Sequence, residues 1–113
     1  MSIGVDLDGT LAEYSGWRGK EFIGEPIQLM MDRVKDWIAE GTEVKIFTAR
    51  AGDPESIPYI KDWLEKHGIP GLEITNIKDH DMIQFWDDRA VSVIPNTGEI
   101  AEDMTWVDFK EKE

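Results

Sequence analysis

Short hydrophobic runs and one clear helical repeat divide the chain into alternating strands and helices. Ile3 and Val5 belong to an apolar run near the start of the chain that is typical of a buried strand. Between residues 26 and 40, apolar residues recur at the three- and four-residue spacing of one helical face. They are Ile27, Met30, Met31, Val34, Trp37 and Ile38. The pattern therefore predicts a strand at residues 3–5 and a helix at residues 26–40.

The rest of the chain continues this alternation. The further predicted elements are a strand at 43–48, a helix from near Pro58 to His67, and strands at 72–76, 82–87 and 91–94. An order of strand, helix, strand, helix, strand is typical of an open parallel sheet with helices on both faces. We therefore expect an α/β fold of the Rossmann-like type.

The composition is typical of a soluble protein with a single domain. The 113 residues suit a single domain with one core, and 41% hydrophobic with 32% charged residues describes a soluble globular chain. No apolar run approaches the roughly 18 residues that a membrane-spanning helix needs, and the N-terminus lacks the basic region of a signal peptide. The chain has no cysteine, which excludes disulfides and thiol chemistry. We expect a cytoplasmic protein without a membrane partner.

The net charge limits the kinds of molecule that the protein is expected to bind. Twelve Lys and Arg residues against 24 Asp and Glu residues give a formal net charge of −12. Such a field repels nucleic acid phosphates and argues against a nonspecific polynucleotide binder. A small phosphorylated substrate remains compatible with it, because a bound divalent cation inverts the local field. The composition does not specify an oligomeric state.

Polar side chains follow three of the predicted strands where each one ends. Asp6 and Asp8 follow the first strand, Thr48 ends the second, Asp87 ends the fourth predicted strand, and Asp88 follows it. In open parallel sheets, ligands bind outside the carboxyl ends of the strands, at the point where the strand order reverses. Buried carboxylates need a compensating cation, and Mg²⁺ prefers hard oxygen ligands. The pattern indicates a Mg²⁺ and phosphate site at this edge of the sheet.

The residues Asp6-Leu7-Asp8-Gly9-Thr10 resemble motif I of the haloacid dehalogenase superfamily, which has the pattern Asp-x-Asp-x-Thr. The resemblance implies that Asp6 is a nucleophile and a Mg²⁺ ligand. It implies that Asp8 is a general acid/base whose backbone carbonyl also binds Mg²⁺. The phosphatases of this superfamily keep the second acid, whereas its dehalogenases lack it.

Three further motifs occur in the order that this superfamily uses. Thr48 is similar to the motif II hydroxyl that binds a phosphoryl oxygen, and Lys78 matches the expected position of the motif III lysine. A lysine there offsets the repulsion between the nucleophile and the phosphate. The sequence Phe85-Trp86-Asp87-Asp88 resembles motif IV, in which Asp87 ligates Mg²⁺ and Asp88 holds a coordinated water.

Two segments and one side chain are open to more than one interpretation. Residues 11–25 form either a surface loop or a flap over the site, and Arg50 either contacts the substrate or pairs with a nearby acid. The gaps between the motifs hold no inserted domain, so the chain resembles a member without a cap. The acidic tail at 99–113 either docks or is partly loose.

Together these features predict one haloacid dehalogenase-like hydrolase domain over residues 1–113. The expected enzyme is a Mg²⁺-dependent phosphatase that hydrolyses a phosphomonoester, with a small molecule as its substrate, through an aspartyl-phosphate on Asp6. One alternative is a phosphate-binding module with weak or no turnover. The other is a polynucleotide-end phosphatase, which requires Arg18, Lys20 and Arg50 to form a basic patch.

Overall fold

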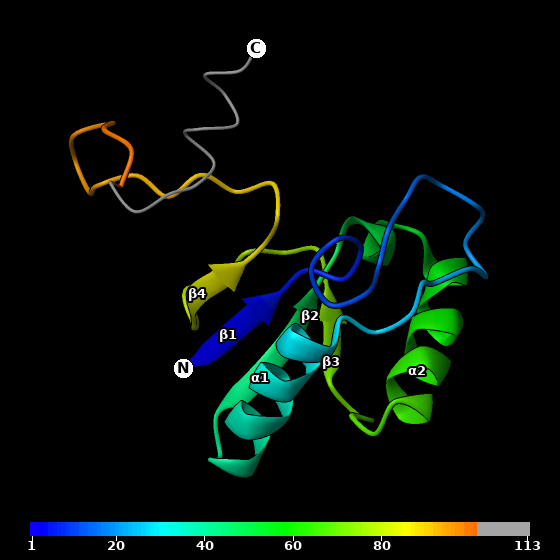
Figure 1. Ribbon diagram of the computed structural model, residues 1–113. Helices are drawn as coiled ribbons and strands as arrows, with labels where there is room; N and C mark the ends of the chain where they lie inside the picture. The colour runs from blue at the N-terminus through cyan, green and yellow to red at the C-terminus, as the bar shows by residue number, and fades with distance from the viewer. Residues whose placement is uncertain (102–113) are drawn as a thin grey trace.

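The structure is a computed structural model that describes residues 1–101. Four strands, two α-helices and two short 3₁₀ helices alternate along the chain (Figure 1). The elements are β1 (Ser2–Val5), α1 (Gln28–Ala39), β2 (Glu43–Phe47), η1 (Ala49–Gly52), η2 (Pro54–Ser56), α2 (Ile57–Lys66), β3 (Glu73–Thr75) and β4 (Met82–Trp86). Six of the predicted elements are confirmed to within about two residues. Most of the predicted tail at 99–113 lies outside the described residues.

The four strands form one parallel sheet in the order β3-β2-β1-β4. The chain runs from β1 outward through β2 to β3 and then returns to the opposite side of β1 for β4. The strand order therefore reverses between β1 and β4. An α/β fold with a parallel, Rossmann-like sheet is what the alternation of strands and helices predicts.

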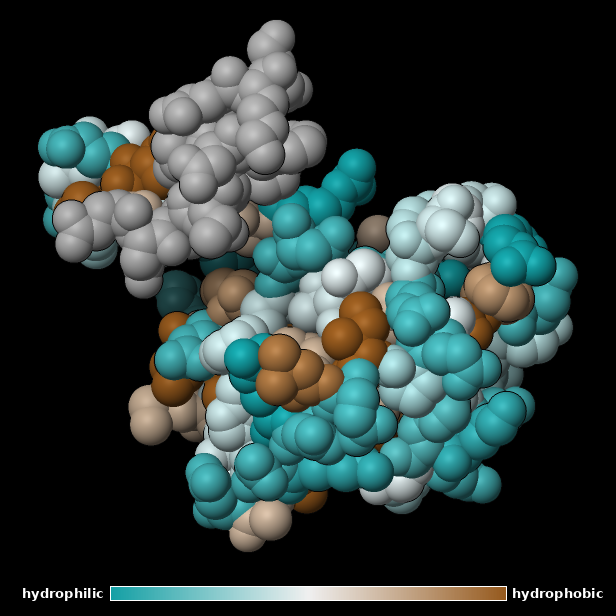
Figure 2. All heavy atoms as spheres, viewed as in Figure 1, coloured by the Kyte–Doolittle hydropathy of each residue, from teal (hydrophilic) through white to brown (hydrophobic). Residues whose placement is uncertain are grey.

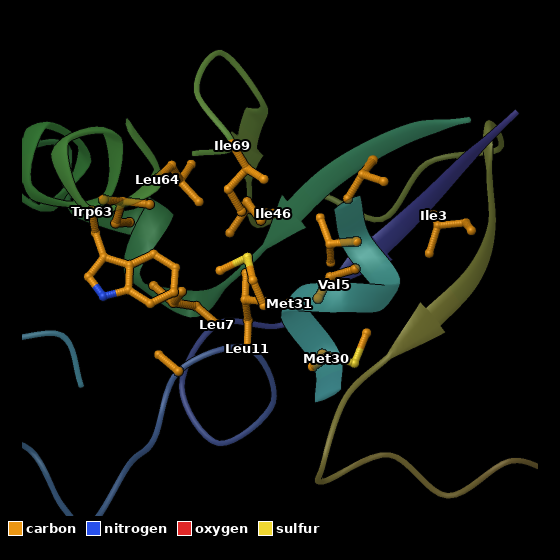
Figure 3. Close-up of a cluster of buried hydrophobic side chains, with 14 residues drawn as sticks. Ile3, Val5, Leu7, Leu11, Met30, Met31, Ile46, Trp63, Leu64 and Ile69 are labelled. Carbon is orange, nitrogen blue, oxygen red and sulfur yellow. The ribbon is translucent and has the colours of Figure 1, made fainter. Parts of the chain in front are cut away.

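Both helices cover the same face of this sheet. Buried residues of α1 and of α2 belong to one cluster with Val5 and Ile46, the inward residues of β1 and β2 (Figure 3). The outer surface of this helical layer is largely hydrophilic in Figure 2, with apolar atoms in small separate areas. This is the expected surface of two amphipathic helices that bury one stripe each.

The prediction of helices on both faces is therefore wrong for the described residues. The segment at 76–81 crosses the second face to reach β4, and its six residues are too few for the helical crossover that usually joins parallel strands. Lys45, whose side chain is buried on this face, fixes the segment through ion pairs with Asp79 (3.2 Å) and Asp81 (3.5 Å). Phe47 and Phe85 pack together on the same face, with 5.4 Å between ring centroids.

The predicted strand at 91–94 is also wrong. Only residues 87–90 separate it from β4, fewer than the six residues that join β3 to β4, and residues 91–94 form no strand of the sheet. Instead the chain folds back on itself after Pro95, where Ile94 N–H donates to the Glu99 carbonyl at 2.8 Å. Asn96 supplies the positive φ of 67° that this turn requires. In Figure 1 this segment extends away from the sheet.

Within residues 1–101, no helix has the length and apolar character needed to cross a bilayer.

The burial pattern of the helices gives a direct stability test. Ile60 in α2 is fully buried, whereas Ile38 in α1 is 40% exposed. We expect Ile60→Ala to lower the free energy of unfolding by about 2–5 kcal/mol, because it leaves a cavity in the core. The same substitution at Ile38 should cost less than about 1 kcal/mol. Urea denaturation measures both, and equal losses would contradict the placement of α2 against the sheet.

Candidate functional site

The candidate site lies where the strand order reverses. Asp6 directly follows β1, and Asp87 and Asp88 directly follow its neighbour β4. One carboxylate oxygen from each of these three residues lies within 4.8 Å of the other two. The backbone fixes this approach, since Asp6 N–H donates to the Trp86 carbonyl at 2.9 Å. The parallel register of β1 and β4 therefore brings together acids that are about 80 residues apart.

Gly9 and Thr10 hold Asp88 in this cluster. Thr10 Oγ1 donates to Asp88 Oδ1 at 3.1 Å and accepts from the Asp88 backbone N–H at 3.0 Å. Gly9 has a φ of +89°, and a Cβ at this position would lie 2.6 Å from Asp88 Oδ2. A side chain at residue 9 is thus disfavoured both by the backbone conformation and by the space that the Asp88 carboxylate occupies.

The environment of Asp6 favours its neutral form. Burial, the charges of Asp87 and Asp88 and a hydrogen bond with Asp88 together raise the pKa of Asp6 from its ordinary 3.8 to about 7, and burial is the largest cause. A hydrogen bond from the Leu7 backbone opposes the rise. Like charges a few ångströms apart cannot all remain ionised without compensation. The cluster therefore needs either a proton or a cation.

A divalent cation fits this cluster. Its donors are carboxylate oxygens from Asp6, Asp87 and Asp88, and two of the three side chains are partly buried. Mg²⁺ takes hard oxygen ligands and retains several waters, so one or two carboxylates are enough to bind it. The grouping includes the Asp6 and Asp87 of the predicted metal site, and it adds the Asp88 side chain as a possible direct ligand.

Thr48 lies beside Asp6, as predicted. The two residues line the same two cavities, and the Thr48 side chain is almost fully buried. Thr48 Oγ1 accepts a hydrogen bond from the Arg50 backbone N–H at 3.2 Å, which caps η1. Because the hydroxyl accepts there, its own proton is free to be donated to an anion in the cavity.

Arg50 pairs with Asp8 rather than pointing into open space. Its Nε and Nη2 donate to the two Asp8 oxygens at 2.7 and 2.9 Å, and the Arg50 side chain is only 6% exposed. Two further hydrogen bonds run to the carbonyls of Lys20 (3.2 Å) and Phe22 (3.0 Å). The sequence allowed Arg50 either to contact the substrate or to pair with a nearby acid, and in the structure it pairs with Asp8.

The segment at 11–25 lies against the site. Its ends are held together by a hydrogen bond from Glu13 N–H to the Glu25 carbonyl at 2.8 Å. Lys20 Nζ forms ion pairs with Asp53 at 3.1 Å and Glu55 at 2.6 Å. Tyr14 and Trp17 from the same segment line a cavity that also contains Asp6 and Asp8. The position is that of the predicted flap, and we use this name for residues 11–25.

The basic residues of the flap do not form a free patch. Arg50 and Lys20 are in the ion pairs described above, and the Arg18 guanidinium lies over the Phe22 ring at 4.1 Å. Two of the three basic residues that the polynucleotide-end alternative requires are therefore paired with acids, whereas the exposed Arg18 contacts an aromatic ring.

Within residues 1–101, no ion pair joins Lys78 to the three acids. Its Nζ lies 5.0 Å from the Phe85 ring centroid, on the sheet face that the helices leave uncovered. The cavity between Asp6 and Asp87 is lined instead by Asn76, which follows the carboxyl end of β3. Asn76 is not among the predicted site residues, although it carries the same signal as the others, a polar residue just after a strand.

The charge cluster gives a pH prediction for the metal-free protein. Between pH 3.8 and about 7, folded Asp6 binds a proton that the unfolded chain has released. Stability should therefore fall as the pH rises through this window, and Asp6→Asn should remove that loss. We expect the variant to be more stable than wild type by on the order of 1–3 kcal/mol at pH 8, and by less at pH 5.

The measurement is urea denaturation in EDTA at both pH values. Asp36→Asn, on the exposed side of α1, changes the same charge without touching the site and serves as the control. A gain from Asp6→Asn that is the same at both pH values would show that Asp6 has an ordinary pKa.

No family model matches this chain, and a search of curated proteins finds no match. One solved structure is similar to it, described as the structure of a conserved protein coded by a locus from Bacteroides thetaiotaomicron. The two chains are 25% identical with a TM-score of 0.64, and the similarity covers 100% of this chain and 92% of that one. The likeness supports the α/β fold, and the description of that protein states no activity.

Proposed function

We propose that this protein hydrolyses phosphate monoesters with Mg²⁺ as cofactor, as a cap-free, haloacid dehalogenase-like phosphatase. The observation that carries the proposal is the gathering of Asp6, Asp87 and Asp88 at the reversal of the strand order, beside the Thr48 hydroxyl. Carboxylates, a hydroxyl donor and a second acid on the same turn are the groups that phosphoryl transfer to a carboxylate requires. Mg²⁺, when bound, supplies neutralising charge for the phosphoryl oxygens.

Each nearby side chain has a role in this reaction. A carboxylate oxygen of Asp6 attacks phosphorus while the bond from phosphorus to the ester oxygen breaks, and Thr48 donates to a phosphoryl oxygen. Asp8 gives a proton to the departing alkoxide and then takes one from the water that attacks the aspartyl-phosphate. As this water attacks phosphorus, the bond from phosphorus to the Asp6 oxygen breaks. The products are the alcohol and inorganic phosphate, and the cycle returns Asp6 as a carboxylate and Asp8 as a protonated acid.

The pairing of Asp8 with Arg50 places a condition on this cycle. Asp8 can protonate an alkoxide only when its carboxyl carries a proton, so the two hydrogen bonds from Arg50 must loosen during turnover. Arg50 also donates to the flap carbonyls of Lys20 and Phe22. Release of Asp8 is therefore coupled to movement of the flap.

The same ion pair is the one observation that favours the alternative of a phosphate-binding module. If Arg50 holds Asp8 permanently, no acid is available for the leaving oxygen and turnover is slow. The two functions differ in whether phosphate release depends on Asp6 and on metal.

Release of inorganic phosphate from a panel of phosphomonoesters tests the proposal. We expect turnover with Mg²⁺, none with EDTA, and a loss of at least about 10³-fold in Asp6→Asn, because the nucleophile is removed. Asp36→Asn, the exposed control on α1, should retain wild-type turnover. Tight phosphate binding without Asp6-dependent turnover would instead identify the binding module.

A further inference from the structure

Two cavities meet at Asp6 and Thr48 and extend in different directions. One, of about 400 Å³, runs under the flap and includes Asp8. The other, of about 430 Å³, runs toward Asn76 and includes Asp87. The candidate proton donor Asp8 and the candidate metal ligand Asp87 therefore line different cavities, which share the nucleophile Asp6.

This division assigns the leaving group to the cavity under the flap. A general acid must lie within hydrogen-bond reach of the oxygen that it protonates. Asp8 lines the flap-side cavity, and the metal ligand Asp87 lines the other one. An ester that places its phosphoryl group at Asp6 and Thr48 must then extend its alcohol beneath the flap.

The wall of the flap-side cavity is aromatic. Tyr14 and Trp17 line it, although they are 50% and 60% exposed to solvent. The Arg50 guanidinium lies 4.8 Å from the centroid of the Trp17 ring, a cation–π contact that favours this position of the ring. Exposed aromatic rings held at the mouth of a small cavity are suited to stacking against a flat ring. The volume lies near the lower end of ligand pockets and suits one small molecule.

The charges of this cavity disfavour a second anionic group. Among the described residues that line it, Arg50 is the one cation, and its guanidinium already serves Asp8 and two backbone carbonyls. Asp53 also lines the cavity, and Lys20 beside it is engaged by Asp53 and Glu55. A further phosphate on the leaving group would lie near carboxylates, and the cations beside it are already engaged in other contacts.

We infer that the substrate is a monoester whose leaving alcohol is uncharged and carries a flat ring that stacks on Trp17 and Tyr14, as in a nucleoside monophosphate. This inference rests on the proposed function, and it adds the class of substrate. Trp17 and Tyr14 act as specificity-determining residues, and the flap selects against bisphosphates and polynucleotide ends.

The test compares esters that differ in one group. Adenosine 5′-monophosphate and ribose 5-phosphate share the ester but differ in the ring, and adenosine 3′,5′-bisphosphate adds one phosphate. We expect kcat/KM of the wild type to be roughly tenfold or more higher for the monophosphate than for ribose 5-phosphate, as base stacking on an aromatic side chain implies. The kcat/KM for the bisphosphate should be lower than that for the monophosphate.

Substitution of Trp17 then tests whether this residue causes the preference for the ester that carries a ring. In Trp17→Ala the ratio between the monophosphate and ribose 5-phosphate should fall toward one, and Trp17→Phe should preserve most of it. Tyr59→Ala, an exposed aromatic residue on α2 outside the cavity, should leave the ratio unchanged. A wild-type ratio near one, or an equal loss for both esters in Trp17→Ala, would overturn the inference, since the second result means that Trp17 acts only through Arg50.

Failure of the proposed function can be distinguished from failure of this inference. If no ester is hydrolysed in an Asp6- and Mg²⁺-dependent way, the phosphatase proposal fails. Calorimetric binding of the monophosphate and of ribose 5-phosphate to the wild-type protein with Mg²⁺ then decides the ring preference. Tighter binding of the monophosphate that Trp17→Ala removes supports the aromatic subsite, and equal or absent binding overturns it.

Discussion

The repulsion among Asp6, Asp87 and Asp88 is the constraint on which the site depends. Two unit charges about 4 Å apart near a protein surface repel each other by roughly 4 kcal/mol. The chain cannot relax this repulsion by separating the three acids, because each follows a strand in a fixed register. Gly9 and Thr10 restrict Asp88 further. The compensating charge must therefore come from a proton or from a bound cation.

Asp8, only two residues from Asp6, receives its compensation from within the chain. Arg50 binds it with two hydrogen bonds in the parallel geometry that makes guanidinium–carboxylate pairs strong. Among the described residues, no salt bridge reaches Asp6, Asp87 or Asp88. One acid of the turn is thus neutralised by the protein, and the three-acid cluster is left for an external cation. Asp6 therefore lies near one acid that is already paired with an arginine and near two acids that need a cation or a proton.

The sequence predicts the parts of this arrangement that depend on local pattern. The strands β1, β2 and β4 are short apolar runs, and acids or a hydroxyl follow directly, so their convergence at one edge follows from parallel topology. The Arg50–Asp8 pair joins residues 42 positions apart and depends on side-chain packing, so the sequence left it as one of two possibilities. The position of Lys78 depends on the path of residues 76–81, which Lys45 fixes from the middle of β2. The single helical layer follows from the length of that same connection, a signal present in the sequence but not used.

A net charge of −12 and an anionic substrate are compatible only if attraction is confined to a small region. A cation among Asp6, Asp87 and Asp88 would reverse the field at the point where the proposed substrate places its phosphoryl group. Under the flap, the Arg50 and Lys20 side chains are already paired with Asp8, Asp53 and Glu55. A molecule with a single phosphate gains the attraction without the repulsion, whereas a polyanion meets both. Under the proposed function, the acidic surface thus favours esters that carry one phosphate, and the aromatic side chains of the flap distinguish among these esters by the shape of the alcohol.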